Sequence, residues 1–196
     1  MKTMTTAKTI FLTLIFLLSS ALHAQDADAL YDAGKQLYDA KKYSLAVKKL
    51  LPAAKQGHRK AQYRMGRCYD KGYGVAEDNG KAFYWYGKSA AQNYAKAQYH
   101  LGRCYYKGKG VGRNYAKAVE LFRKAADKDN GDGQLALGKC YMKGRGVTKD
   151  AAKAKELFLK AVNNEKDGAE IKRELREEAA QGDADAKSIL KMCGLK

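Results

Sequence analysis

Apolar residues recur along the chain in two stripes, each with helical spacing. The first stripe follows the i, i+4, i+7, i+8 pattern of one buried helix face. It consists of Ala61, Met65, Cys68 and Tyr69, and it returns as Ala97, Leu101, Cys104 and Tyr105. The second stripe consists of Ala82, Trp85, Tyr86 and Ala90, and it returns as Ala118, Leu121, Phe122 and Ala126. The two stripes predict pairs of amphipathic helices.

A ten-residue segment joins the two stripes and occurs three times. It reads "GRCYDKGYGV" from Gly66, "GRCYYKGKGV" from Gly102 and "GKCYMKGRGV" from Gly138, so the period is 36 residues. Self-similarity at a period of this size is typical of stacked helical hairpins. The first glycine has no Cβ and lets the partner helix approach closely, and the later glycine pair permits the positive φ that ends the helix. Polar residues suited to N-cap the next helix follow each segment, namely Asp78, Asn114 and Asp150.

The two ends of the array depart from this period. Gly34 precedes Gly66 by only 32 residues, because the first unit lacks the glycine-rich link. Cys193 follows Cys140 by 53 residues, 17 more than one period, so we expect an inserted extra helix within residues 163–181. The residues after it match the first helix of a repeat and predict a capping helix.

The repeated units resemble the Sel-1-like repeats, which are relatives of the tetratricopeptide repeats. The resemblance rests on "AQYRMGRCYDKGYGVAEDNGKAFYWYGKSAAQNYAKAQYHLGRCYYKGKGV" and covers residues 29–162, with a fragment at 179–193. It implies an all-α fold, a right-handed α-solenoid of helix-turn-helix repeats, whose usual role is to hold proteins or peptides. The expected units are a tetratricopeptide-like pair at 27–57, Sel-1-like repeats at 58–93, 94–129 and 130–165, an extra helix at 166–181 and a capping helix at 182–196.

Residues 1–24 have the pattern of a cleavable secretory signal peptide. Two lysines precede an apolar run over residues 10–18, and small residues lead to Ala24. The run is shorter than the roughly 20 residues of a membrane-spanning helix, and no cysteine follows it to accept a lipid, so we expect no transmembrane or lipid anchor. The repeat domain, residues 25–196, is therefore expected in the periplasm or secreted outside the cell.

The expected mature chain is strongly basic. Without residues 1–24 it has 36 basic and 21 acidic residues, a formal charge of +15. Such a charge attracts polyanions, acidic proteins or anionic surfaces, so generic polyanion binding is one alternative function. Export makes nucleic acid a poor natural ligand and no recognition motif for it is visible, so we expect no specific nucleic-acid binding. The sequence does not indicate an oligomeric state.

Cys68, Cys104, Cys140 and Cys193 occur once per repeat, at one aligned position. Equivalent stacked helices lie about 8 to 10 Å apart, beyond the roughly 7 Å limit for a bridged Cα pair, so we expect buried free thiols. Cysteine-rich relatives carry two cysteines per repeat, joined between the helices, and have been linked to penicillin binding and β-lactam hydrolysis. A β-lactam-binding or β-lactam-hydrolysing protein is therefore a second alternative, although the cysteine pairs and an S-x-x-K motif are missing.

Few residues suggest catalysis or metal binding. His58 and His100, the histidines of the expected mature chain, stand at non-equivalent positions of their repeats, which disfavours a metal site. No serine or cysteine has a histidine that the repeat spacing would place as its base. The acidic cluster Glu174, Glu177 and Glu178 is explained by pairs with basic neighbours on a solvated helix face. We therefore expect no metal, no cofactor and no enzymatic activity.

The remaining feature is a face lined by cations and tyrosines. The tetratricopeptide pattern implies that residues at fixed offsets from the first-helix glycine line the concave side. They are Lys35, Arg67, Arg103, Lys139, Lys71, Lys107, Lys143, Tyr31, Tyr63, Tyr99, Tyr38 and Tyr106. Stacked cations between tyrosines suit an extended acidic peptide or a terminal carboxylate. The alternative is an ordinary solvent-exposed helical surface, since lysine is abundant throughout the chain. The sequence favours an exported protein–protein interaction scaffold that binds a protein or peptide partner along this face.

Overall fold

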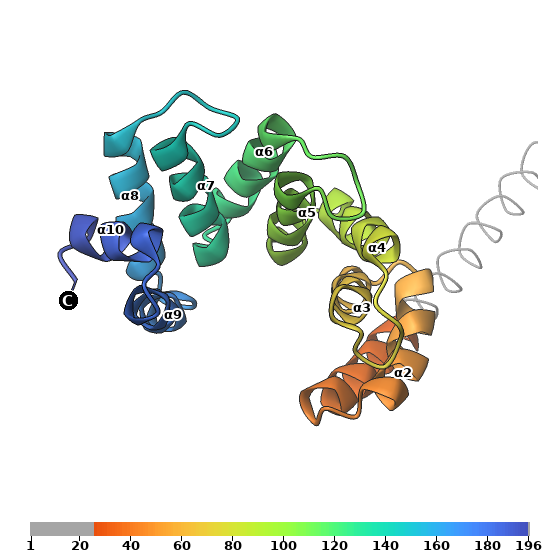
Figure 1. Ribbon diagram of the computed structural model, residues 1–196. Helices are drawn as coiled ribbons and strands as arrows, with labels where there is room; N and C mark the ends of the chain where they lie inside the picture. The colour runs from red at the N-terminus through yellow and green to blue at the C-terminus, as the bar shows by residue number, and fades with distance from the viewer. Residues whose placement is uncertain (1–25, 196) are drawn as a thin grey trace, which may run out of the picture. The chain divides into compact units, whose positions relative to one another are not determined.

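A computed structural model describes residues 26–195, and all regular structure in this range is helical (Figure 1). The signal peptide expected at residues 1–24 lies outside the described residues. The chain divides into two compact units, Met1–Asp78 and Asn79–Lys196. The prediction of an all-α solenoid of helix-turn-helix repeats is confirmed.

The first unit has three helices in its described part. They are a helix over residues 26–39, α2 (Tyr43–Lys55) and α3 (Arg59–Lys71). Leu50 of α2 is fully buried against Gly34 of the first helix, where an added Cβ would stand 2.7 Å from the Leu50 side chain. The missing side chain at Gly34 thus lets the two helices pack closely.

The second unit contains α4 to α10, and each helix packs against the next one. Their bounds are α4 Asn79–Ala91, α5 Ala95–Lys107, α6 Tyr115–Ala126, α7 Gly131–Lys143, α8 Ala151–Val162, α9 Gly168–Ala180 and α10 Ala184–Met192. The buried rings of Phe122 and Phe158 occupy the space that a Cβ on Gly102 and Gly138, respectively, would need. The recurrent glycine of the first helix therefore has the packing role that the sequence predicts.

The glycine pair of each link serves two purposes. Gly108 and Gly144 end α5 and α7 in the left-handed conformation, with φ angles of 73° and 66°. The second glycine lies against the preceding repeat, since a Cβ on Gly146 would overlap the carbonyl group of Tyr115 at the start of α6. Each link is thereby held close to the hairpin before it.

Two of the predicted N-caps are confirmed. Asn114 Oδ1 accepts a hydrogen bond from the backbone nitrogen of Lys117 at 2.9 Å, and Asp150 Oδ1 accepts one from that of Lys153 at 2.8 Å. Each bond satisfies an amide group that the first turn of a helix would otherwise leave unpaired.

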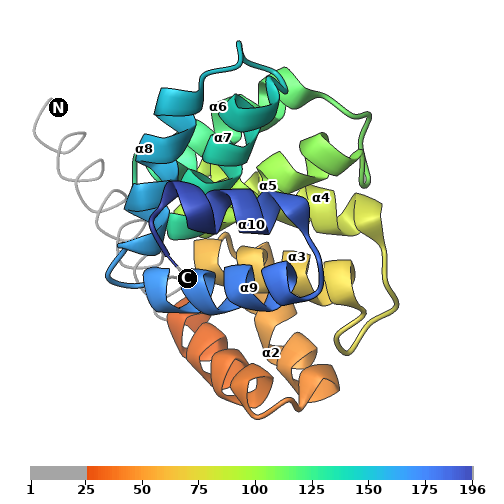
Figure 2. The same cartoon turned by 60° about the vertical axis from the view of Figure 1, so that its left-hand side comes forward.

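α9 runs beside α7 in the same direction. Asp167, just before α9, accepts a hydrogen bond from the backbone nitrogen of Gly131 at the start of α7, at 2.9 Å. Farther along, the Glu178 carboxylate of α9 lies 3.9 Å from Lys139 Nζ of α7. α9 therefore follows α5 and α7 in the row of first helices, whereas the sequence alignment assigned that role to the last helix. α10 instead packs against α8 and α9 (Figure 2).

Candidate binding face

The predicted binding residues fall in both units. In the first unit, Lys35 and Lys71 are exposed, and Arg67 is partly buried. The Lys35 ammonium pairs with Asp39 at 2.9 Å, and Arg67 Nη1 donates a hydrogen bond to the Tyr63 hydroxyl at 3.3 Å. Arg67 and Tyr63 are thus positioned as a pair on one face of α3.

The other two predicted binding tyrosines of the first unit, Tyr31 and Tyr38, take part in packing. Tyr31 is 9% exposed, and its ring stacks on His58 with the centroids 4.3 Å apart. Tyr38 lies edge-on to Tyr73 at 6.0 Å, and the Arg64 guanidinium lies 4.7 Å from its ring centre. Burial raises the pKa of Tyr38 to about 12. Both rings stabilise the unit, so only part of each side chain is accessible to a partner.

In the second unit, α5 carries Arg103 and Lys107 together with Tyr99. The guanidinium of Arg103 lies 5.7 Å from the centre of the Tyr99 ring, within cation–π range. Burial raises the pKa of Tyr99 to about 12, and the Asp132 carboxylate adds to the rise. Arg103 and Tyr99 therefore form a pair like that of Arg67 and Tyr63 on α3. We call Tyr99, Arg103, Lys107, Lys139 and Lys143 the cation face of the second unit.

The lysines of this face that lie on α7 are paired with acids from later in the chain. The Lys139 ammonium lies 3.9 Å from the Glu178 carboxylate of α9, and the Lys143 ammonium contacts the Asp185 carboxylate of α10. Asp183, just before α10, interacts with the same two lysines. Its pKa is lowered first by the N-cap hydrogen bond from the backbone nitrogen of Ala186 and then by the charges of Lys139 and Lys143. Acidic side chains thus cover the α7 end of the cation face.

Further carboxylates lie near Arg103. Burial raises the pKa of Asp132 on α7, the neighbouring carboxylates of Asp167 and Glu174 raise it further, and Arg103 lowers it. The sequence predicted only local pairs for the acids of α9. Two such pairs exist, since Arg173 lies 3.0 Å from the Glu177 carboxylate and 3.7 Å from that of Glu170. Glu178 instead reaches across to α7. The four glutamates of α9 were the only sign in the sequence that an acid could pair outside this helix. Which helix Glu178 contacts depends on how the insertion packs, and the sequence does not show that.

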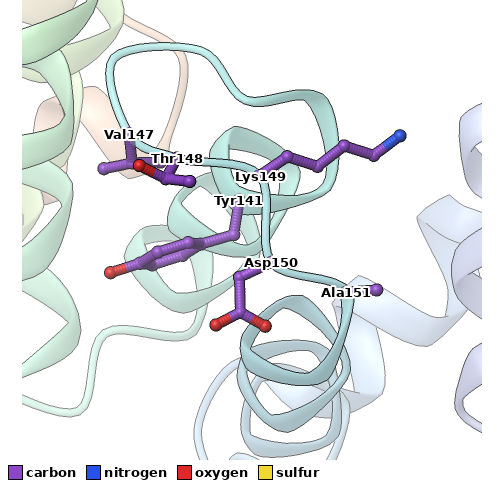
Figure 3. A pocket seen from close by; sticks show the side chains of 6 residues that line it. All are labelled: Tyr141, Val147, Thr148, Lys149, Asp150 and Ala151. Carbon is purple, nitrogen blue, oxygen red and sulfur yellow. The ribbon is translucent and has the colours of Figure 1, made fainter.

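An open pocket lies at the link between α7 and α8, away from the predicted face. It is lined by Tyr141, Val147, Thr148, Lys149, Asp150 and Ala151 (Figure 3). Asp150 caps α8, and the Lys149 side chain extends away from the Tyr141 ring. No predicted binding residue lines this pocket.

All four cysteines lie in the described part of the chain, and the structure contains them as free thiols, as predicted. Cys68, Cys104 and Cys140 are buried inside first helices. Cys193 differs because α10 ends at Met192, so its thiol is only partly buried.

Within residues 26–195, no three His, Cys, Asp or Glu side chains are grouped as metal ligands. In the same range, every helix is too short or too polar to span a bilayer.

The stacked hairpins, with their glycine-dependent packing and capped second helices, define a tandem-repeat protein of the α-solenoid class. The Sel1 repeat model matches residues 59–94, 95–130 and 131–165, more than half of the chain, so the chain belongs to the Sel1 repeat family. Proteins of this family generally mediate protein–protein interactions and are generally not enzymes. No curated protein matches the chain at a significant level.

Solved structures of repeat proteins resemble the chain. The protective antigen c5321 of uropathogenic Escherichia coli, which displays an SLR fold, is 29% identical with a TM-score of 0.70, over 91% of this chain and 40% of that one. A Sel1 repeat protein from Oxalobacter formigenes is 30% identical with a TM-score of 0.68, over 84% of this chain and 67% of that one. Cysteine-rich protein B of Helicobacter pylori is 26% identical with a TM-score of 0.45, over 67% of this chain and 93% of that one. The chain thus spans about two fifths of the length of the E. coli antigen.

Proposed function

We propose that the chain is an exported scaffold that binds an acidic protein or peptide through the cations and tyrosines of its first helices. The observation that carries the proposal is the arginine–tyrosine pair on α5, where Arg103 lies 5.7 Å from the Tyr99 ring centre. α5 also bears Lys96 and Lys107 and contains no acidic residue. An acidic ligand would gain charge-assisted hydrogen bonds from the cations and aromatic contact from the tyrosine.

The pair on α3 supports the same reading. Arg67 donates to Tyr63 at 3.3 Å, and the helix carries five basic residues against the single acid Asp70. Cation and ring are four residues apart on both helices, so each presents them on one helix face. Each of these two helices would therefore offer a ligand carboxylate the same local arrangement of groups.

Charge reversal at both pairs tests the proposal. In fluorescence anisotropy with a labelled deca-glutamate peptide, we expect Arg67→Glu/Arg103→Glu to abolish binding while circular dichroism shows unchanged helicity. The matched control is Lys48→Glu/Lys155→Glu, which makes the same change in net charge at exposed positions of α2 and α8. Binding that survives the arginine reversal would refute the assignment of the face. Equal loss in both variants would instead indicate generic polyanion binding through net charge.

The proposed export depends on the pattern of residues 1–24. Fractionation of expressing cells with N-terminal sequencing of the released chain tests it, and we expect a mature N-terminus near Ala24. A chain that stays in the cytoplasm with residues 1–24 attached would contradict export without bearing on the binding face.

A further inference from the structure

Two acidic side chains from the C-terminal helices reach the lysines that α7 contributes to the cation face. Glu178 of α9 lies 3.9 Å from the Lys139 ammonium, and Asp185 of α10 contacts that of Lys143. The four side chains are between 30% and 50% exposed, so the pairs lie at the surface and a ligand could reach them. α9 and α10 lie together at the C-terminal end of this unit (Figure 2).

Both lysines of α7 meet carboxylates from outside their helix. The Asp132 carboxylate of α7 likewise lies near Arg103 of α5. The carboxylate contacts on α7 are of the kind that an acidic ligand would make. Part of the cation face is therefore already occupied by groups with the chemistry of the proposed ligand.

We infer that Glu178 and Asp185 are an internal competitor for acidic ligands, which occupies Lys139 and Lys143 and weakens the binding of such a ligand to the α7 part of the cation face. The inference rests on the proposed function and specifies how the same face selects its ligand. The partner it implies is an acidic segment short enough to be held by the Arg103–Tyr99 pair of α5, and longer acidic segments must displace the internal carboxylates.

The competition takes place between side chains, without movement of α9. Ile171 and Leu175 of α9 are buried in one core cluster with Phe158 and Ile189, which holds the helix in place. Glu178 and Asp185 are attached to this fixed frame by flexible side chains, and exposed ion pairs of this kind are individually weak. A ligand carboxylate can therefore replace them, but each replacement reduces the net gain from binding.

Neutralising the competitor tests the inference. In the anisotropy assay with labelled deca-glutamate, we expect Glu178→Gln/Asp185→Asn to bind about 3- to 10-fold more tightly than the unmodified chain at low salt, as expected for two weak surface pairs. The gain should disappear when Lys139→Gln/Lys143→Gln is added, because the freed lysines are its source. Asp183 is left unchanged because it caps α10, accepting from the backbone nitrogen of Ala186 at 2.7 Å.

The matched control is Glu170→Gln/Glu177→Gln, which changes net charge equally but removes acids that pair with Arg173 on α9 itself. Equal tightening in this control would assign the effect to net charge and overturn the inference. If the unmodified chain binds, the Arg67→Glu/Arg103→Glu variant does not, and Glu178→Gln/Asp185→Asn binds no better, the inference fails while the proposed function stands. If no variant binds the peptide, both fail.

Discussion

Arg145, in the link between α7 and α8, donates a hydrogen bond to the hydroxyl of Tyr106 on α5 and places its guanidinium 5.5 Å from the centre of that ring. The same guanidinium lies 5.8 Å from the ring of Tyr115, the first residue of α6. In the first unit, Tyr73 has the same place in its link and stacks on Tyr43, the first residue of α2, at 4.3 Å. In these two links, the same position thus clamps the repeat onto the hairpin before it, with arginine in one and tyrosine in the other.

Removing this clamp should weaken the stacking of repeats. We expect Arg145→Ala to lower the free energy of unfolding in urea by about 1 to 2 kcal/mol, since it removes a hydrogen bond and two cation–π contacts. The control is Arg173→Ala, which removes an exposed arginine whose pairs lie within one helix and should have a smaller effect. Equal destabilisation by the two substitutions would contradict the clamp.

The clamp also gives a packing role to one row of the predicted tyrosines. Tyr38 and Tyr106 were predicted to lie on the binding face because each stands four residues after the first-helix glycine. This spacing predicts which side of the helix a residue faces, but not what packs against that side. The link of the next repeat folds back over that side and uses both rings for packing. Contacts of a loop with the preceding repeat depend on its path, which spacing does not reveal.

The regular part of the fold could be predicted because Gly66, Gly102 and Gly138 follow one another at a constant spacing of 36 residues. Glycine at 102 and 138 and the caps at 114 and 150 have the roles that the spacing predicts. The insertion around α9 breaks the period, so its helical register and its neighbours could not be obtained by alignment. The pairing of Glu178 with Lys139 was missed for this reason, and with it the acidic cover on the cation face.

Close helix packing at the first-helix glycine gives a sharp test. A Cβ at Gly138 would stand 2.5 Å from the ring of Phe158, which is fully buried and cannot move aside without disturbing the core. We expect Gly138→Ala to destabilise the chain by about 1 to 3 kcal/mol in urea unfolding, because overpacking outweighs the gain in helix propensity. A smaller side chain should relieve the clash, so Gly138→Ala should cost less in a Phe158→Leu background than alone.

Gly87 is the matched control for this substitution. It also lies inside a helix, but an added Cβ there meets nothing within 4 Å. Gly87→Ala should therefore stabilise the chain by up to about 1 kcal/mol. Similar effects of the same sign at both glycines would refute the packing role of Gly138.

The thiols should differ in their reactivity. Burial raises the pKa of Cys68 and Cys140 to about 11, whereas Cys193 is only partly buried, beyond the end of α10. In the native chain at about pH 8 we expect a disulfide reagent to modify Cys193 fastest, because thiolate content and access control the rate. Cys193→Ser should remove the fast phase, and denaturant should expose all four thiols. Fewer than four after unfolding would contradict the free-thiol assignment.

His58 couples the stability of the first unit to pH. Its Nδ1 accepts a hydrogen bond from the backbone nitrogen of Ala61 at 3.0 Å, so the ring caps α3 in its neutral form, and Nε2 lies 3.1 Å from Asp28 Oδ1. Burial lowers the pKa of His58 below 6.5, outweighing the opposing effect of Asp28. The unfolded chain therefore binds the proton first, and the contribution of His58 to stability is complete above about pH 6.5 and is lost as the pH falls through the lower folded pKa.

His58→Asn keeps a capping acceptor but cannot titrate, so the stability of the unmodified chain relative to this variant should fall between about pH 7 and pH 5 in urea unfolding. A difference that stays constant across that range would show that the ring does not act as a neutral cap.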